Sequence, residues 1–292
     1  MKIINVIHNK LKSIKQFIYL ILALFFLMSN LVYGGDELNK VYAEIEKQHK
    51  NFIKETTQIR KQFNSLSSDD SPEAMTIDMA IEEMDRCVNE LKFPGIEIGS
   101  NVNGKNLSEE VFYSIFKHAE KIGCSIFVHP WEMMGQSDMK KYWLPWLVGM
   151  PAETSRAICS IIFGGILDRY PALKIAFAHG GGAFPFTIGR IEHGFNVRPD
   201  LCAIDNERLP SSYLEHIYVD SLVHDEKTMS FLIDTLGENQ IALGSDYPFP
   251  LGEHHPGKLI EGMDLPDSTK QRLLAGTALE WLGLDESEFT GN

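Results

Sequence analysis

The chain has 292 residues, of which 44% are hydrophobic, and its formal net charge at pH 7 is −13. This length fits one barrel-sized domain or two smaller ones, and the hydrophobic content is sufficient for a buried core. The negative charge argues against nucleic acid as a partner, although local arginines could still bind a small anionic substrate.

The first 35 residues form a leader that is basic and then hydrophobic. Four lysines lie between residues 2 and 15, residues 17–28 are an apolar run, and two glycines follow at 34 and 35. This order resembles a signal peptide or a short anchor, so contact with a membrane is expected only through residues 17–33. The alternatives are an apolar helix packed on the domain and a gene model joined to foreign sequence.

Residues 36–70 are expected to form an amphipathic helix and a linker. The stretch 36–63 is rich in helix-forming residues, with apolar side chains at Val41, Ile45, Phe52 and Ile59. Residues 65–72 are rich in serine and aspartate, which is typical of a linker. We therefore place a domain boundary near residue 70 and expect a further domain over 71–292.

Beyond the linker, predicted helices alternate with predicted strands. The patterns indicate helices at 77–91, 109–122, 154–168 and 227–236, and strands at 93–99, 124–129, 174–179, 215–222 and 240–246. Helix alternating with strand predicts a parallel α/β sheet. A closed barrel of this type needs eight strands, and only five are predicted.

Three polar side chains stand at the ends of predicted strands. His129 and His179 each close an apolar run, and Asp246 closes the last strand. Because the carboxyl ends of parallel strands meet at one edge of a sheet, we expect these side chains to be neighbours. A single histidine at a strand end is more often a structural residue. Two imidazoles and a carboxylate in this arrangement instead suit a divalent ion such as zinc.

The four cysteines give no sign of a disulfide framework. Cys87, Cys124, Cys159 and Cys202 are widely spaced and form no C-x-x-C pair. This spacing is typical of reduced core cysteines in a cytosolic protein, whereas the leader is typical of a secreted or anchored one.

Five longer motifs accompany the strand ends. They are FVHPW at 127–131, YWLPWLVGMPAET at 142–154, AHGGGAFPF at 178–186, RPDLC at 198–202 and GSDYPFPLG at 244–252. From about residue 71 to the carboxyl end, the chain closely resembles the 2-amino-3-carboxymuconate-6-semialdehyde decarboxylase family of the amidohydrolase superfamily. The resemblance implies a cytosolic, zinc-dependent, non-oxidative decarboxylase with a TIM-type (β/α)8 barrel. It would act in the kynurenine pathway of tryptophan breakdown and limit the formation of quinolinate.

The resemblance also implies roles for individual residues. His129 would bind zinc from the fifth strand and Asp246 from the eighth, and His179 would be the acid or base beside the metal. Trp146 would line the substrate pocket, although plain packing explains it equally well. Arg198 would reach into the neighbouring subunit of a homodimer and hold a carboxylate of the small anionic substrate, a task that suits the bidentate guanidinium. Its alternative is a solvated surface charge.

The chain departs from the family pattern at its amino-terminal end. Relatives carry a His-x-His pair on a first strand, which supplies two more zinc ligands, and no His-x-His occurs in this sequence. We therefore expect an α/β fold in the form of a partial TIM-type barrel that lacks its first strands and has an N-terminal apolar and helical extension. Weak or absent zinc binding is expected as well. The alternatives are a catalytically impaired paralogue or truncated form that acts as a dimerising, regulatory subunit, and another hydrolase of the superfamily.

Overall fold

The computed structural model describes residues 72–287, and the residues from Glu73 onward belong to one compact unit. The predicted leader of 1–35 and the predicted helix of 36–70 lie outside the described residues, so both stay predictions. Among the helices of residues 72–287, none is long and apolar enough to cross a membrane.

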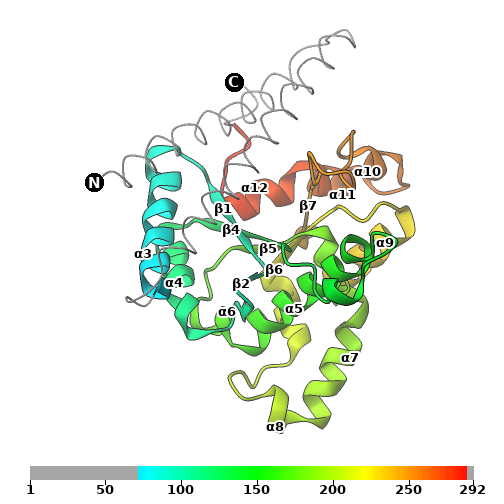
Figure 1. Cartoon of the computed structure of the whole chain (residues 1–292). Helices are drawn as coiled ribbons and strands as arrows, with labels where there is room; N and C mark the ends of the chain where they lie inside the picture. Colours follow the sequence, from blue (N-terminus) through cyan, green and yellow to red (C-terminus); the bar gives the residue numbers. More distant parts are fainter. Residues whose placement is uncertain (1–71, 288–292) are drawn as a thin grey trace. The chain divides into compact units, whose positions relative to one another are not determined.

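A five-stranded parallel sheet is the centre of this unit (Figure 1). Its strands lie in the order β1-β4-β5-β6-β7, and each pairs in parallel with the next. Their bounds are Gly95–Gly99, Ser125–His129, Ile175–Phe177, Ile217–Asp220 and Ile241–Ala242. The predicted parallel α/β sheet is therefore confirmed, and all five strands were anticipated from the sequence.

Helices connect the strands, and each of the four predicted helices has a counterpart among them. The main ones are α3 (Pro72–Asp85), α4 (Tyr113–Ile122), α5 (Met150–Phe163), α6 (Ile166–Arg169), α7 (Phe184–Val197), α8 (Pro199–Cys202), α9 (Glu226–Leu236), α10 (Lys258–Gly262), α11 (Asp267–Gln271) and α12 (Thr277–Leu282). Two details correct the sequence analysis. The helix predicted over 154–168 begins earlier and is interrupted at Gly164 and Gly165, the latter with φ of +64°. In addition, the sequence analysis had not predicted α7, α8, α10, α11, α12 or a small hairpin of β2 (Asn101–Val102) and β3 (Lys105–Asn106).

The core lies between one face of the sheet and the helices. Ile126, Val128, Ile175 and Phe177 on this face are fully buried, in one cluster with residues of α4 and α5 such as Phe116. The alternate side chains of the same strands point to the opposite face. Phe127 and Tyr218 on that face are only partly buried, and Glu97 reaches solvent. The strands are therefore not buried equally on both faces, although a continuous apolar run in the sequence is typical of a strand that is buried on both.

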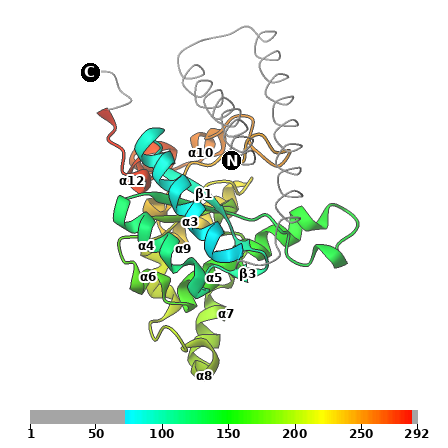
Figure 2. The same cartoon turned by 60° about the vertical axis from the view of Figure 1, so that its left-hand side comes forward.

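Two loops leave the sheet at the carboxyl ends of its strands, one after β4 and one after β7. The segment 130–149 between β4 and α5 extends away from the strands (Figure 2). The strand predicted over 240–246 is shorter than expected, because β7 ends at Ala242 and Asp246 lies in the loop beyond it. The position of this carboxylate therefore depends on loop conformation rather than on the sheet alone.

Candidate metal centre

His129 is the last residue of β4, where it pairs in register with Gly99 of β1. Its carbonyl oxygen accepts a hydrogen bond from the backbone N–H of Ser100 at 3.2 Å. The imidazole therefore starts from a backbone position that two adjacent strands hold, at the edge where parallel α/β sheets place their functional residues.

His179 lies two residues after β5, at the start of a tight turn with φ of +58°. This left-handed conformation is uncommon for a residue other than glycine, and such strain is often found at functional sites. The turn is held by Asp220 at the end of β6, whose Oδ1 accepts a hydrogen bond from the N–H of Gly180 at 2.9 Å. Gly182 closes it by donating from its N–H to the His179 carbonyl oxygen at 2.9 Å.

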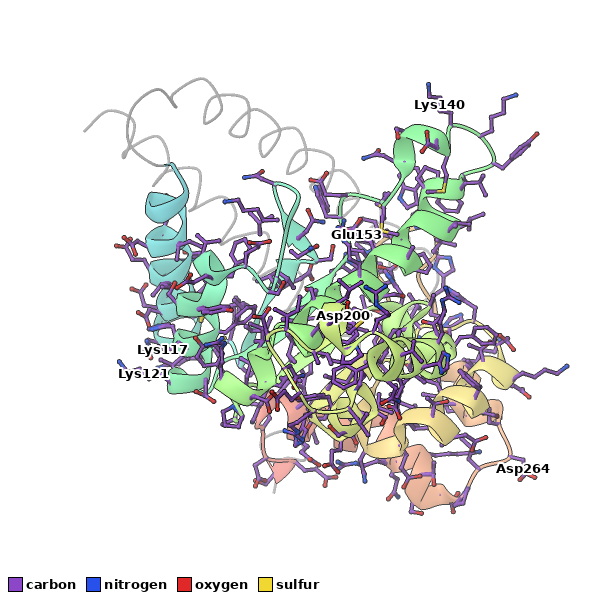
Figure 3. All side chains as sticks on the ribbon, turned by 90° about the horizontal axis from the view of Figure 1, so that it is seen from below. Lys117, Lys121, Lys140, Glu153, Asp200 and Asp264 are labelled. Atoms are coloured by element: carbon purple, nitrogen blue, oxygen red, sulfur yellow. The ribbon has the colours of Figure 1, made fainter. Side chains whose placement is uncertain are left out.

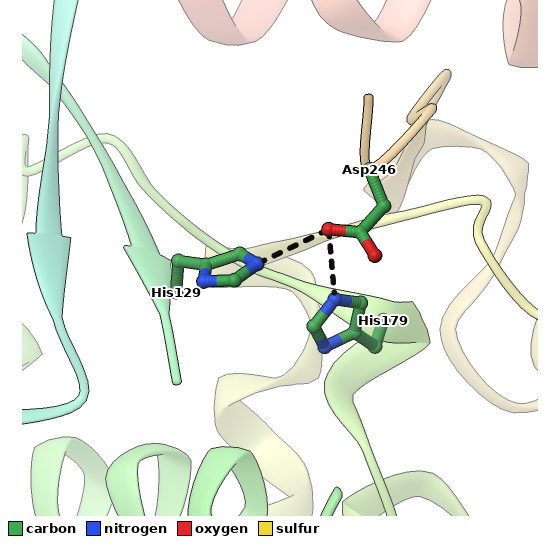
Figure 4. A group of neighbouring side chains, drawn as sticks. All are labelled: His129, His179 and Asp246. Atoms are coloured by element: carbon green, nitrogen blue, oxygen red, sulfur yellow. Dashed lines mark hydrogen bonds and ion pairs between the residues drawn. The ribbon is translucent and has the colours of Figure 1, made fainter. Parts of the chain in front are cut away.

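Asp246 meets both histidines (Figure 4). Its Oδ1 atom lies 3.4 Å from Nε2 of His129 and 3.5 Å from Nε2 of His179. The three side chains are 8–14% exposed, and one ligand atom of each lies within 4.8 Å of the others. The residues predicted to be neighbours are thus brought together, across 117 positions of sequence in the case of His129 and Asp246.

The charges of the cluster favour an ionised carboxylate. Although burial opposes its charge, the hydrogen bond from His129 and the nearby imidazole of His179 lower the pKa of Asp246 to about 2. Burial likewise disfavours a charged His129, but the hydrogen bond to Asp246 and the charge of Glu97 raise the pKa of this imidazole overall. Desolvation by the surrounding protein raises the pKa of Glu97, even though part of this side chain reaches solvent.

The donor set fits a divalent metal ion. Both ring nitrogens of His179 are buried and make no hydrogen bond of good geometry within the described residues, since its contact with Asp246 is a loose 3.5 Å. A buried imidazole without such a partner is unusual for a purely structural residue. Two imidazole nitrogens and an ionised carboxylate are ligands that zinc, manganese and related ions accept.

A hollow that is partly open to solvent adjoins the cluster. His129 and Asp246 form part of its wall, and Trp146 is among its lining residues. The remaining lining residues are mostly aromatic, thioether or proline side chains: Pro130, Trp131, Met133, Trp143, Met150, Phe249, Pro250 and Leu251. An apolar wall beside a few polar groups is typical of a small-molecule site.

Arg198 lies elsewhere, immediately after α7, and does not line this hollow. Its Nε and Nη2 donate to the two carboxylate oxygens of Asp200 at 2.9 and 2.7 Å, and both side chains are more than half exposed. Within a single chain, the structure therefore does not bring Arg198 to the cluster.

Sequence reasoning missed two residues near the cluster. The ring of Phe249 stacks on His129 with centroids 6.2 Å apart, and Glu97 interacts electrostatically with all three members of the cluster. The alternation of Gly95–Gly99 could have revealed Glu97, because a single acidic residue interrupts an otherwise apolar strand.

The prediction of unpaired cysteines is confirmed for all four, but only Cys124 is fully buried.

A model of the amidohydrolase family matches residues 19–284. The chain belongs to this amidohydrolase family. It is 59% identical over 211 residues to the 2-amino-3-carboxymuconate-6-semialdehyde decarboxylase of Dictyostelium discoideum, across 72% of this chain and 59% of that relative. It is 42% identical over 238 residues to the decarboxylase of the same name from Caenorhabditis elegans, across 70% of this chain and 59% of the relative.

A solved structure shares the amidohydrolase fold of this chain. The 5-carboxyvanillate decarboxylase of Novosphingobium aromaticivorans, in complex with manganese and a nitrobenzoic acid, superposes with a TM-score of 0.62 at 24% identity. The match covers 72% of this chain and 62% of that protein. In each of these comparisons, the chain spans less than two thirds of the length of its relative.

Proposed function

We propose that the chain is a metal-dependent decarboxylase that converts 2-amino-3-carboxymuconate 6-semialdehyde to 2-aminomuconate 6-semialdehyde, in the kynurenine pathway of tryptophan catabolism. The observation that carries the proposal is the convergence of His129, His179 and Asp246 beside an apolar hollow. The 59% identity with a decarboxylase of this name supports the choice of substrate. A cytosolic location follows from the resemblance and stays a prediction.

His129 and Asp246 would hold the metal ion, which we propose to be zinc. When bound, the ion supplies Lewis-acid chemistry that lowers the pKa of water. The low pKa of Asp246 keeps its carboxylate ionised and ready to ligate at neutral pH. Neutral imidazole is the form of His129 that ligates, so protonation of this residue would compete with the metal.

His179 is the proposed proton-transfer residue. In a non-oxidative decarboxylation, the bond between the substrate carbon and its carboxylate carbon breaks. The electron pair stays on the substrate carbon, which must then take up a proton as carbon dioxide leaves. The imidazole of His179 lies beside the cluster and has no strong hydrogen bond within the described residues, so it is available to transfer this proton.

Arg198 is proposed to act across a homodimer. Exposed apolar side chains, Val197, Leu201 and Ile204, lie close to it in sequence, which is consistent with an interface between copies. A second copy could bring this guanidinium to the partner's hollow, where it would exchange Asp200 for a substrate carboxylate. Sedimentation velocity over a range of protein concentrations tests the dimer.

The five parallel strands are proposed to be the last five of a (β/α)8 barrel. The described residues provide three candidate ligand groups, and the sequence has no His-x-His pair to add two more. We therefore propose that the chain binds zinc weakly. Metal analysis of the purified chain tests this, and one tightly held zinc per chain would contradict it.

A direct assay of carbon dioxide release tests the activity. The full chain, supplied with excess zinc or manganese, is incubated with the aminocarboxymuconate substrate, and His179→Ala serves as the control. Release by the wild type and its loss in the variant support the proposal. If no carbon dioxide is released at saturating metal, the proposed activity is refuted. The alternative of a catalytically impaired subunit would then be favoured, and the lack of a His-x-His pair in this sequence is consistent with it. Association with an intact family member would then be tested by co-expression.

A further inference from the structure

Glu153 in the first turn of α5 is fully buried and lies outside the group of proposed ligands. A carboxylate in such a position is costly unless hydrogen bonds stabilise it. Its Oε1 atom accepts four: from Oγ of Ser100, from Nδ2 of Asn101 at 3.2 Å, and from the backbone N–H groups of Trp131 and Glu132 at 3.0 and 3.1 Å. One oxygen therefore gathers donors from two separate segments of the chain.

Both segments flank His129. Ser100 directly follows β1, and its N–H donates to the His129 carbonyl oxygen. Trp131 and Glu132 come two and three residues after His129, at the start of the segment 130–149. Figure 3 labels Glu153 near the base of this segment and Lys140 near its far end. The buried carboxylate thus joins α5 to the residues that follow β1 and to those that follow β4, the strand that ends at His129.

Packing of side chains fixes this part of the chain only in part. Pro130 is buried and Met133 is half-buried, but the indole of Trp131 is 62% exposed. The backbone bonds to Glu153 therefore add a restraint on the residues that directly follow His129. Hydrogen bonds to a charged acceptor are about twice as strong as those to a neutral one, so the carboxylate suits this task.

We propose that Glu153 is a positioning residue, which fixes the segment after His129 and thereby the direction of this imidazole toward the metal. The inference rests on the proposed function for its link to the metal. It assigns a role to the acidic residue of the motif at 142–154, for which the proposed chemistry has no use. Glu153 acts only through its neighbours and is not expected to contact substrate.

Two variants and one matched control test the inference. Glu153→Ala removes every acceptor, whereas Glu153→Gln keeps the shape and one acceptor oxygen but loses the charge. Asn206→Ala is the control, because Asn206 is also buried and donates to the carbonyl oxygen of Ile162 at 2.8 Å, toward the other end of α5. It removes a comparable set of buried hydrogen bonds without touching the segment after His129.

The first measurement is hydrogen–deuterium exchange of the metal-free full chain. Relative to the rest of the protein, exchange at the amides of Trp131 and Glu132 should quicken about tenfold in Glu153→Gln and further in Glu153→Ala. In Asn206→Ala it should follow the rest of the protein. If Glu153→Ala does not fold, Glu153→Gln decides. Exchange within about twofold of the wild type in the folded variants would overturn the inference.

The second measurement is titration with Co²⁺, whose visible absorption reports the geometry of its ligands. We expect Glu153→Ala to bind cobalt at least about tenfold more weakly with an altered spectrum, Glu153→Gln to recover part of both, and Asn206→Ala to match the wild type. Unchanged affinity and spectrum in Glu153→Ala, or an equal change in Asn206→Ala, would overturn the positioning of His129. If the wild type binds no cobalt, the proposed metal site fails, while the exchange experiment still decides whether Glu153 holds the segment.

Discussion

Gly182 offers a strict test of how the turn after His179 is held. Its backbone lies at φ +63° and ψ −129°, a region that is accessible to glycine but not to other residues without strain. A Cβ atom at this position would lie 2.3 Å from the carbonyl oxygen of Pro151 and 3.0 Å from Cβ of Thr154. The oxygen belongs to the backbone of α5, so it cannot simply rotate away.

We expect Gly182→Ala to lower the free energy of unfolding by about 2–6 kcal/mol. Backbone strain contributes about 1–3 kcal/mol, and overpacking against α5 contributes about 1–3 kcal/mol. Because a domain is typically stable by about 5–15 kcal/mol, this change would be a large share of the total. The variant should also bind metal more weakly, since the N–H of Gly182 holds the carbonyl oxygen of His179.

Gly189→Ala is the matched control. Gly189 lies within α7, and a Cβ atom there meets nothing within 4 Å. Alanine is favoured over glycine in a helix by about 0.8–1.0 kcal/mol, so this variant should be more stable than the wild type. Urea denaturation followed by tryptophan fluorescence measures both. If Gly182→Ala unfolds within about 0.5 kcal/mol of the wild type while Gly189→Ala behaves as expected, the account of the turn is wrong.

Three further outcomes are expected. In the metal-free protein, NMR titration of His129 should give a midpoint above 6.5, and Glu97→Gln should move it downward, because a neighbouring negative charge is lost. Since the pKa of His129 is raised in the folded state, its protonated form stabilises the metal-free fold below pH 6.5, and this contribution disappears as pH rises through the raised pKa. If the NMR midpoint of His129 does not shift in Glu97→Gln, the proposed coupling between the two residues is wrong. Asp225→Ala should lower the free energy of unfolding, because its carboxylate caps the N-terminus of α9, and should leave cobalt binding unchanged. Arg198→Ala should leave the melting temperature and metal content unchanged but reduce kcat/KM, and equal kcat/KM values would disprove the proposed contact with substrate.

The sequence was sufficient to predict the parallel sheet and the meeting of His129, His179 and Asp246, because the chain leaves parallel strands at one and the same edge of the sheet. Loop conformation does not follow in the same way. The short β7 and the turn that presents Asp246 depend on contacts that strand periodicity does not encode.

Glu153 shows a second limit. A single glutamate in a mostly apolar stretch looks like a solvated helix residue, and only the folded structure reveals that its partners lie 21 to 53 positions earlier in the chain. The role of Arg198 has a different kind of limit, because it depends on a second copy of the chain rather than on the fold of one.

The loop origin of Asp246 has a consequence for how the molecule is tied together. A ligand supplied by a strand adds little to what the sheet already fixes, but one supplied by a loop makes the bound ion a cross-link. An ion held by both His129 and Asp246 would close a loop of more than a hundred residues, and closing so long a loop lowers the conformational entropy of the unfolded chain. The ion would then stabilise the carboxyl-terminal third of the chain in addition to its chemical role. Removal of the ion by a chelator should therefore destabilise that third before the remainder of the sheet.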